Sequence, residues 1–248
     1  VRSAARRVKE LADDRRLGIV QDGHRSSTVR ASADLGLLGE RTLLSHATDL
    51  DDVEIGLIAD SGSAVAHNPS AIYSQFGRCP VPELIEAGVT VGLGSDATAP
   101  DRSADMFRHM FQLTRYHRAV RQDPSWFPPG TAIEMATIRS AEALGMGETV
   151  GSLEVGKRAD LIVVDTDRPH LAPVTHPVHQ VVYFATGADV DLVMVDGSVL
   201  AEHGTPVDLD VASIISAAAH EQSLAFDRIG LGVPQDRPGL WDAPAYRG

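Results

Sequence analysis

The chain has 248 residues, of which 43% are hydrophobic and 23% are charged, as is ordinary for a globular protein. Its formal net charge of −12 argues against nucleic acid and anionic membrane surfaces as partners, because both favour proteins rich in Lys and Arg. The single cysteine, Cys79, excludes an intramolecular disulfide, and the residues contain neither a signal-peptide core nor a membrane-length apolar run, so we expect a cytoplasmic protein.

The N-terminal part of the chain alternates between short apolar runs and helical patterns. Strands are expected at residues 17–20, 41–46, 63–67 and 89–93. Helices are expected at residues 4–15, 28–38, 51–61 and 81–87. This repeated order of strand and helix predicts an α/β fold with parallel strands joined by crossover helices.

Polar residues stand at the carboxyl ends of three consecutive predicted strands. They are His46, His67 and Asp96. In α/β barrels the chemistry lies at that end of the strands. Each residue could instead cap a helix or satisfy a loop, but three at the same end of neighbouring strands favour a common site.

The C-terminal part of the chain shows a different pattern. Helices are expected at residues 103–121 and 131–146, on either side of a proline-rich loop. Strands follow at residues 159–165, 179–185 and 190–204, the last containing an Asp196-Gly197 hairpin signal. A final helix is expected at residues 208–227, with an extended tail after Gly230.

Four blocks of the sequence closely resemble the amidohydrolase superfamily, in particular its cytosine-deaminase-like and chlorohydrolase-like branch. In chain order they read LLSHATDLDDVEIGLIADSGSAVAHNPS, PVPELIEAGVTVGLGSDATAPDRSADMF, ATIRSAEALGMGETVGSLEVGKRADLIVVD and VDLVMVDGSVL. The segment GSLEVGKRADLIVVD is similar to the family's passage from its barrel into a β-sandwich. The resemblance covers roughly residues 35–205.

The resemblance implies a metal-dependent (β/α)8 barrel beside a composite β-sandwich. It also implies one divalent metal, Zn²⁺ or alternatively Fe²⁺, held by a His-x-His pair, a fifth-strand His and an eighth-strand Asp. Asp96 matches that Asp, which binds the metal and takes a proton from the attacking water. His46 matches the sixth-strand His that polarises the group under attack, and His67 matches a histidine that shapes the substrate pocket.

These residue types suit hydrolytic chemistry. Zn²⁺ lowers the pKa of bound water from ~15.7 toward ~7. A carboxylate beside it can carry a proton to a leaving amine, and an imidazole can stabilise the tetrahedral adduct.

The resemblance is incomplete at the remaining metal positions. No two of the ten histidines are two residues apart, so the His-x-His pair is absent. At the fifth-strand position the chain reads GIVQDGH, which offers His24 as the ligand and Asp22 as the alternative. The family's nearby Glu, which protonates the substrate ring, is also missing. We therefore assign the metal to Asp96 and His24.

The number of strand–helix units is half of what a barrel requires. A complete barrel takes about 250 residues, so we expect residues 1–150 to form the second half of one. Residues 151–205 are expected to form a β-sandwich segment, and residues 206–248 a helix and tail. The other half is on residues that precede Val1, or two chains assemble, or the chain is a remnant, and we favour a fragment of a longer chain.

Two functions follow from these observations. The first is a metal-dependent hydrolase of non-peptide C–N bonds that deaminates an aminated heterocycle, a small-molecule substrate, and works as a homo-oligomer. The second is a truncated, metal-free, non-catalytic half-barrel that acts through assembly. Cys79 lacks the basic partner or helix start that would make it reactive, so we expect it to be inert.

Overall fold

The computed structural model describes residues 2–23, 26–72, 77–97 and 103–230. Its contacts divide the chain into two compact units, Val1–Gly204 and Thr205–Gly248. In the described part of the chain, every helix is too short or too polar to cross a membrane.

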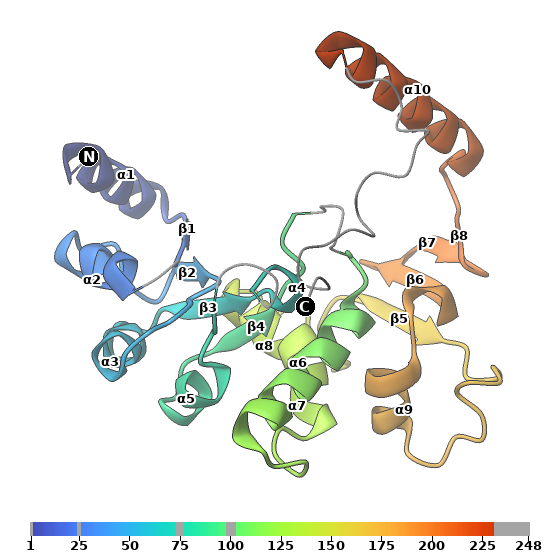
Figure 1. Ribbon diagram of the computed structural model, residues 1–248, viewed down its shortest axis with the longest axis horizontal. Coiled ribbons are helices and arrows are strands. Elements are labelled where there is room, and N and C mark those ends of the chain that lie inside the picture. The colour runs from blue at the N-terminus through green and yellow to red at the C-terminus, as the bar shows by residue number, and fades with distance from the viewer. Residues whose placement is uncertain (1, 24–25, 73–76, 98–102, 231–248) are drawn as a thin grey trace, which may run out of the picture. The chain divides into compact units, whose positions relative to one another are not determined.

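A four-stranded parallel sheet opens the first unit, and Figure 1 shows its strands side by side. The strands neighbour one another in chain order and are β1 (Ile19–Asp22), β2 (Thr42–Ser45), β3 (Ala64–His67) and β4 (Val91–Leu93). The helices around them are α1 (Arg2–Arg15), α2 (Ser26–Asp34), α3 (Asp52–Ser61), α4 (Pro69–Ala71) and α5 (Val81–Glu86). The predicted alternation of parallel strands and helices is confirmed.

The pairing register aligns the carboxyl ends of the strands. Asp22 lies beside Ser45, Ser45 beside Ala66, and His67 beside Leu93. Backbone bonds continue past the strand ends, because Gly23 N–H donates to the Ser45 carbonyl (2.7 Å) and His46 N–H donates to the Ala66 carbonyl (2.9 Å). The residues that follow each strand are therefore held at one common edge.

Local sequence signals explain where α3 begins and ends. The Asp51 carboxylate accepts a bond from Glu54 N–H (2.9 Å), and the Glu54 carboxylate accepts one from Asp51 N–H (3.2 Å), which forms a capping box. Gly62 closes the helix at φ 71°, a left-handed conformation that glycine adopts without strain. These caps set the length of the crossover between β2 and β3.

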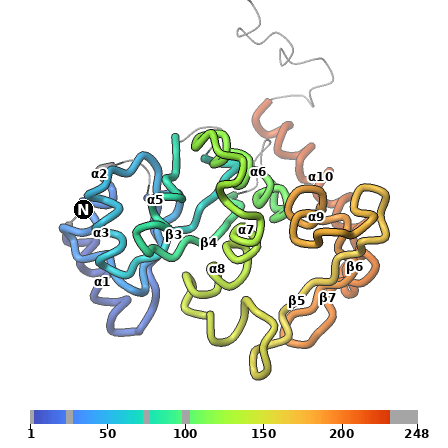
Figure 2. The backbone as a smooth tube through the Cα atoms, turned by 90° about the horizontal axis from the view of Figure 1, so that it is seen from below, coloured from blue at the N-terminus to red at the C-terminus, as the bar shows by residue number. Residues whose placement is uncertain are grey.

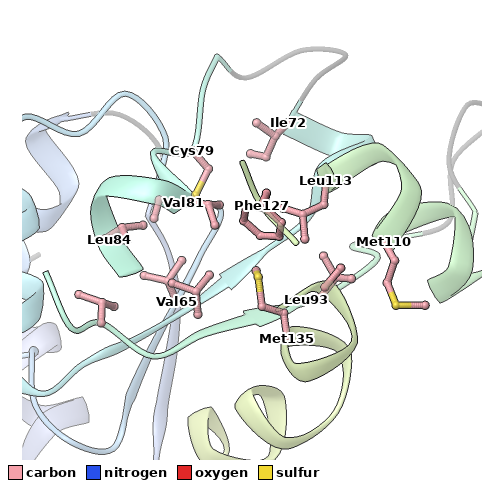
Figure 3. Close-up of a cluster of buried hydrophobic side chains, with 14 of the residues drawn as sticks. Val65, Ile72, Cys79, Val81, Leu84, Leu93, Met110, Leu113, Phe127 and Met135 are labelled. Atoms are coloured by element: carbon pink, nitrogen blue, oxygen red, sulfur yellow. The ribbon is translucent and has the colours of Figure 1, made fainter. Parts of the chain in front are cut away.

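One hydrophobic core joins the sheet to its helices (Figure 3). Val65 of β3 and Leu93 of β4 pack in it with Leu84 of α5. Leu113 of α6 (Met106–Arg121) and Met135 of α7 (Pro129–Ala136) complete this part of the cluster. All five side chains are buried, so the hydrophobic core holds β3 and β4 in place.

The helix predicted over residues 131–146 is wrong in one respect, because the structure has two helices there. They are α7 and α8 (Ile138–Ala143), separated at Thr137, whose φ of −128° and ψ of −98° are not helical. The break places Ser140 against β4, where Ser140 Oγ accepts a bond from Leu93 N–H (3.1 Å). Figure 2 shows α7 and α8 beside β4. The periodicity of apolar residues could not predict this break, because the break depends on the contact between Ser140 and Leu93 of β4.

A second sheet of the first unit is antiparallel. It contains β5 (Leu161–Val164), β6 (Val190–Val195) and β7 (Ser198–Glu202). Asp196 and Gly197 join β6 to β7 with φ values of 50° and 79°, which confirms the predicted hairpin.

The strand predicted at residues 179–185 is wrong, because this segment lies in α9 (Pro177–Phe184), which is followed by a short 3₁₀ helix, η2 (Gly187–Asp189). Pro177 occupies the first helical turn, where its missing N–H costs nothing. The Gln180 side chain accepts bonds from Thr175 N–H (3.1 Å) and His176 N–H (3.2 Å), and so satisfies the start of the helix. These two signals outweigh the β-branched and aromatic residues that favoured a strand.

The second unit contains β8 (Thr205–Pro206) and α10 (Val211–Ile229). Asp210 caps α10 by accepting a bond from Ser213 N–H (3.0 Å), and Gly230 ends it at φ 68°. The predicted final helix is thus present, three residues later than expected at its start. The tail predicted after Gly230 lies outside the described residues.

Candidate active site

Three polar side chains from different strands meet at the carboxyl edge of the parallel sheet. Asp22 is the last residue of β1, His46 follows β2 directly, and Asp96 follows β4. His46 Nε2 is 3.7 Å from Asp96 Oδ2 and 3.9 Å from Asp22 Oδ1. The structure therefore brings these three residues together around one imidazole nitrogen.

The loop that carries His46 has an unusual backbone. His46, Ala47 and Asp49 have φ values of 74°, 47° and 52°, a region that non-glycine residues seldom occupy. Such conformations persist only where the surroundings enforce them. The strain is concentrated beside the three converging side chains.

Contacts with residues 77–78 hold this loop in place. Asp49 N–H donates to the Arg78 carbonyl (2.7 Å), and Arg78 N–H donates to Asp49 Oδ1 (3.0 Å). A Cβ atom on Gly77 would lie only 2.2 Å from Asp49 Oδ2, so only glycine permits this approach. These contacts fix the backbone of the loop that carries His46, and the His46 side chain is buried.

Asp96 also has a left-handed backbone, with a φ of 62°. Aspartate and asparagine tolerate this region better than most residues. Its carboxylate accepts a bond from Ala97 N–H, and its side chain is 22% exposed. Asp96 is therefore accessible to a small molecule, whereas the side chain of Asp22 is largely in solvent, at 72%.

Asn68 joins two strand ends and was missed by sequence reasoning. Its side-chain nitrogen Nδ2 lies 3.1 Å from Ser45 Oγ and 3.2 Å from His46 Nδ1. The sequence signal is the position of Asn68 itself, directly after β3, where the Asn-Pro pair was interpreted only as the end of a strand. Asn68 directly follows β3 as His46 directly follows β2, so both residues lie at the same edge of the parallel sheet.

His67 lies deeper than the other strand-end residues. It is fully buried, and its ring centroid is 5.8 Å from that of His117 on α6. Burial lowers the pKa of His67 well below its ordinary value, and His117, His109 and His46 lower it further by charge repulsion. A neutral, enclosed ring suits the shaping of a pocket, and its contact with substrate stays a prediction.

The metal ligands are only partly represented in the described residues. His24 lies outside them. Within the described ranges, no group of three or more His, Cys, Asp and Glu side chains is close enough to hold a metal ion. The donor types around His46 suit zinc, which takes nitrogen and carboxylate oxygen, but their number falls short of a complete site.

Cys79 has the inert character that the sequence predicts. It is fully buried, and burial raises the pKa of its thiol. A protonated thiol is a poor nucleophile.

The sequence and the fold of this chain are similar to those of known proteins. A model of the amidohydrolase family matches residues 8–200. The 5-methylthioadenosine/S-adenosylhomocysteine deaminase of Syntrophobacter fumaroxidans is 38% identical over 183 residues, which cover 73% of this chain and 42% of that protein. The 5′-deoxyadenosine deaminase of Methanothermobacter thermautotrophicus is 36% identical over 206 residues, which cover 82% and 48% of the two chains.

The fold of this chain is similar to those of two solved zinc-containing enzymes. An adenosine deaminase from Xanthomonas campestris with bound zinc superposes with a TM-score of 0.85 at 29% identity, covering 90% of this chain and 54% of its own. The atrazine chlorohydrolase of Arthrobacter aurescens complexed with zinc superposes with a TM-score of 0.76 at 26% identity, covering 89% and 52%. The chain thus spans about half the length of the proteins it matches.

Proposed function

Because the chain belongs to the amidohydrolase family, we propose that it forms part of a metal-dependent hydrolase that deaminates an aminated heterocycle. The substrate class is a 6-aminopurine nucleoside. This class is supported by the names of the relatives, which act on 5-methylthioadenosine, S-adenosylhomocysteine and 5′-deoxyadenosine. All three carry an adenine base, whose exocyclic amine leaves as ammonia.

The observation that carries this proposal is the convergence of Asp96 and His46 at the strand ends, with 3.7 Å between Oδ2 and Nε2. Asp96 accepts a proton from the attacking water and delivers it to the leaving amine. His46 donates a hydrogen bond toward the charge that develops on the substrate. His67 shapes the pocket beneath them.

A zinc ion, when bound, supplies a water of lowered pKa and polarises the substrate. In this chain, Asp96 and His24 would hold this ion. The donor set of the described residues is incomplete, so the remaining ligands come from elsewhere. The four-stranded sheet is the second half of an eight-stranded barrel, whose first half carries the His-x-His pair, and the length of the relatives supports this arrangement.

A second function is favoured by one observation. That function is a metal-free half-barrel that acts through assembly with a second chain, and the observation is that the described residues nowhere bring three or more His, Cys, Asp and Glu side chains close enough together to hold a metal ion. The two functions differ in what the protein does with an adenine nucleoside.

Ammonia release tests the proposal. The 248-residue chain and the complete product of its gene are each incubated with adenosine, 5′-methylthioadenosine and 5′-deoxyadenosine, with cytidine as the control substrate. We expect ammonia from the adenine nucleosides, loss of release after treatment with a zinc chelator, and recovery when zinc is returned. Release that survives complete metal removal would contradict the metal-dependent mechanism, and no release from either protein would favour the non-catalytic function.

A further inference from the structure

We propose that Asn68 is a positioning residue that holds His46 in a single neutral tautomer, with the proton on Nε2. The catalytic meaning of this role rests on the proposed function, but the tautomer itself is a property of the chain. The contacts of Asn68, the local backbone and the carboxylates around His46 each support it.

The hydrogen bonds of Asn68 determine which ring nitrogen accepts. Its Nδ2 is 3.2 Å from His46 Nδ1 and 3.1 Å from Ser45 Oγ. An amide nitrogen can only donate, so Nδ1 of His46 accepts and carries no proton. In a neutral imidazole the proton is then on Nε2.

Two features of the backbone leave the Asn68 side chain available for this task. Asn68 is the N-cap residue of α4, a position where asparagine normally bonds to the helix, yet its side chain makes no capping bond. Gly94 supplies the space for the amide, because a Cβ atom there would lie 2.3 Å from Asn68 Oδ1. With an exposed fraction of 5%, the amide has little opportunity to exchange its partners for water.

The carboxylates on the opposite side of the ring favour the same tautomer. Nε2 of His46 faces the carboxylates of Asp96 at 3.7 Å and Asp22 at 3.9 Å. A lone pair on Nε2 would be repelled by these oxygens, whereas an N–H is attracted by them. Asn68 and the two carboxylates therefore act together, and His46 presents a donor where the substrate is attacked.

Nitrogen NMR of the metal-free 248-residue chain tests the tautomer directly. Protonated and unprotonated imidazole nitrogens have well-separated ¹⁵N shifts, and the His46 signals are identified by their loss in His46→Gln. The spectra are recorded at about pH 8.5, two units above the usual imidazole pKa. We expect His46 to show an unprotonated Nδ1 and a protonated Nε2.

Variants of Asn68 distinguish a residue that sets the tautomer of His46 from one that only fills space beside it. Asn68→Asp keeps the shape but can only accept, so we expect the proton to move to Nδ1. Ser45→Ala removes only the other bond of the amide and is expected to leave the wild-type pattern. If Asn68→Asp does not fold, Asn68→Ala is expected to raise the share of the Nδ1-protonated tautomer above its wild-type level, because only the two carboxylates then favour a proton on Nε2.

Turnover supplies a second readout. In the active protein we expect Asn68→Asp to lower kcat by about 10²-fold, with KM nearly unchanged, because the substrate still fits. A wild-type ring protonated on Nδ1, or a pattern that every Asn68 variant leaves unaltered, would overturn the proposal. Because the spectra need neither zinc nor substrate, absent deaminase activity would contradict the proposed function and leave the tautomer assignment standing.

Discussion

Asp96→Asn is expected to lower deaminase turnover by about 10³-fold or more, since it removes both a metal ligand and the group that carries the proton. The fold is expected to survive, because asparagine also tolerates the left-handed backbone found at this position, where φ is 62°. We expect the free energy of unfolding to change by less than about 1 kcal/mol. Ammonia release and urea denaturation measure the two effects on the same samples.

Asp22→Asn is the matched control for this variant. It makes the same chemical change at a carboxylate that lies 3.9 Å from the same His46 nitrogen, but whose side chain is 72% exposed. A small loss of turnover would assign the fifth-strand ligand to His24, and a loss as large as that of Asp96→Asn would assign it to Asp22. Wild-type turnover in Asp96→Asn would remove Asp96 from the mechanism.

Acidification is expected to destabilise the first unit through His117. This fully buried side chain stacks on Phe127, with ring centroids 5.9 Å apart. The pKa of His117 is lowered from 6.5 to about 4, chiefly by burial; the charges of Arg78 and Arg121 also lower it, and Glu83 opposes them. In the unfolded chain the same imidazole returns to its ordinary pKa.

The direction of the effect follows from proton binding. Between about pH 6.5 and 4 the unfolded chain binds a proton at His117 that the folded chain does not, so stability falls as the pH is lowered. The full pKa difference corresponds to about 3 kcal/mol, of which about 2 kcal/mol is lost between about pH 7.5 and 5.

Denaturant unfolding at these two pH values measures this loss. In His117→Gln, which cannot titrate, we expect the pH-dependent loss to shrink by about 2 kcal/mol. His176→Gln removes an exposed histidine of the same unit and is expected to leave the loss unchanged. Equal pH dependence in wild type and His117→Gln would show that His117 is not the buried neutral group inferred from the structure.

The parts of the site that depend on strand order could be predicted from the sequence. His46 and Asp96 each follow an apolar run, and parallel strands bring such positions to one edge whatever the intervening helices do. The family resemblance, which rests on whole blocks of sequence, is confirmed by the match over residues 8–200. The roles of His46, His67 and Asp96 stay predictions.

Features that depend on contacts between distant residues could not be predicted. Asn68 follows a strand as His46 does, but its two partners become visible only when β2 and β3 lie side by side. The break at Thr137 allows Ser140 to accept a hydrogen bond from Leu93, which is far away in sequence. α9 was misjudged because its apolar residues suit either state, and a capping side chain, Gln180, decides between them.

Zinc content measured by mass spectrometry on the complete gene product and its Asp96→Asn variant tests the central claim most directly. The account predicts one zinc ion per chain in the wild-type protein, and a large loss in the variant after both are dialysed against zinc-free buffer. Equal zinc in the two proteins would contradict the assignment of Asp96 as a ligand. A correctly folded wild-type protein that takes up no zinc would contradict the metal-dependent mechanism as a whole.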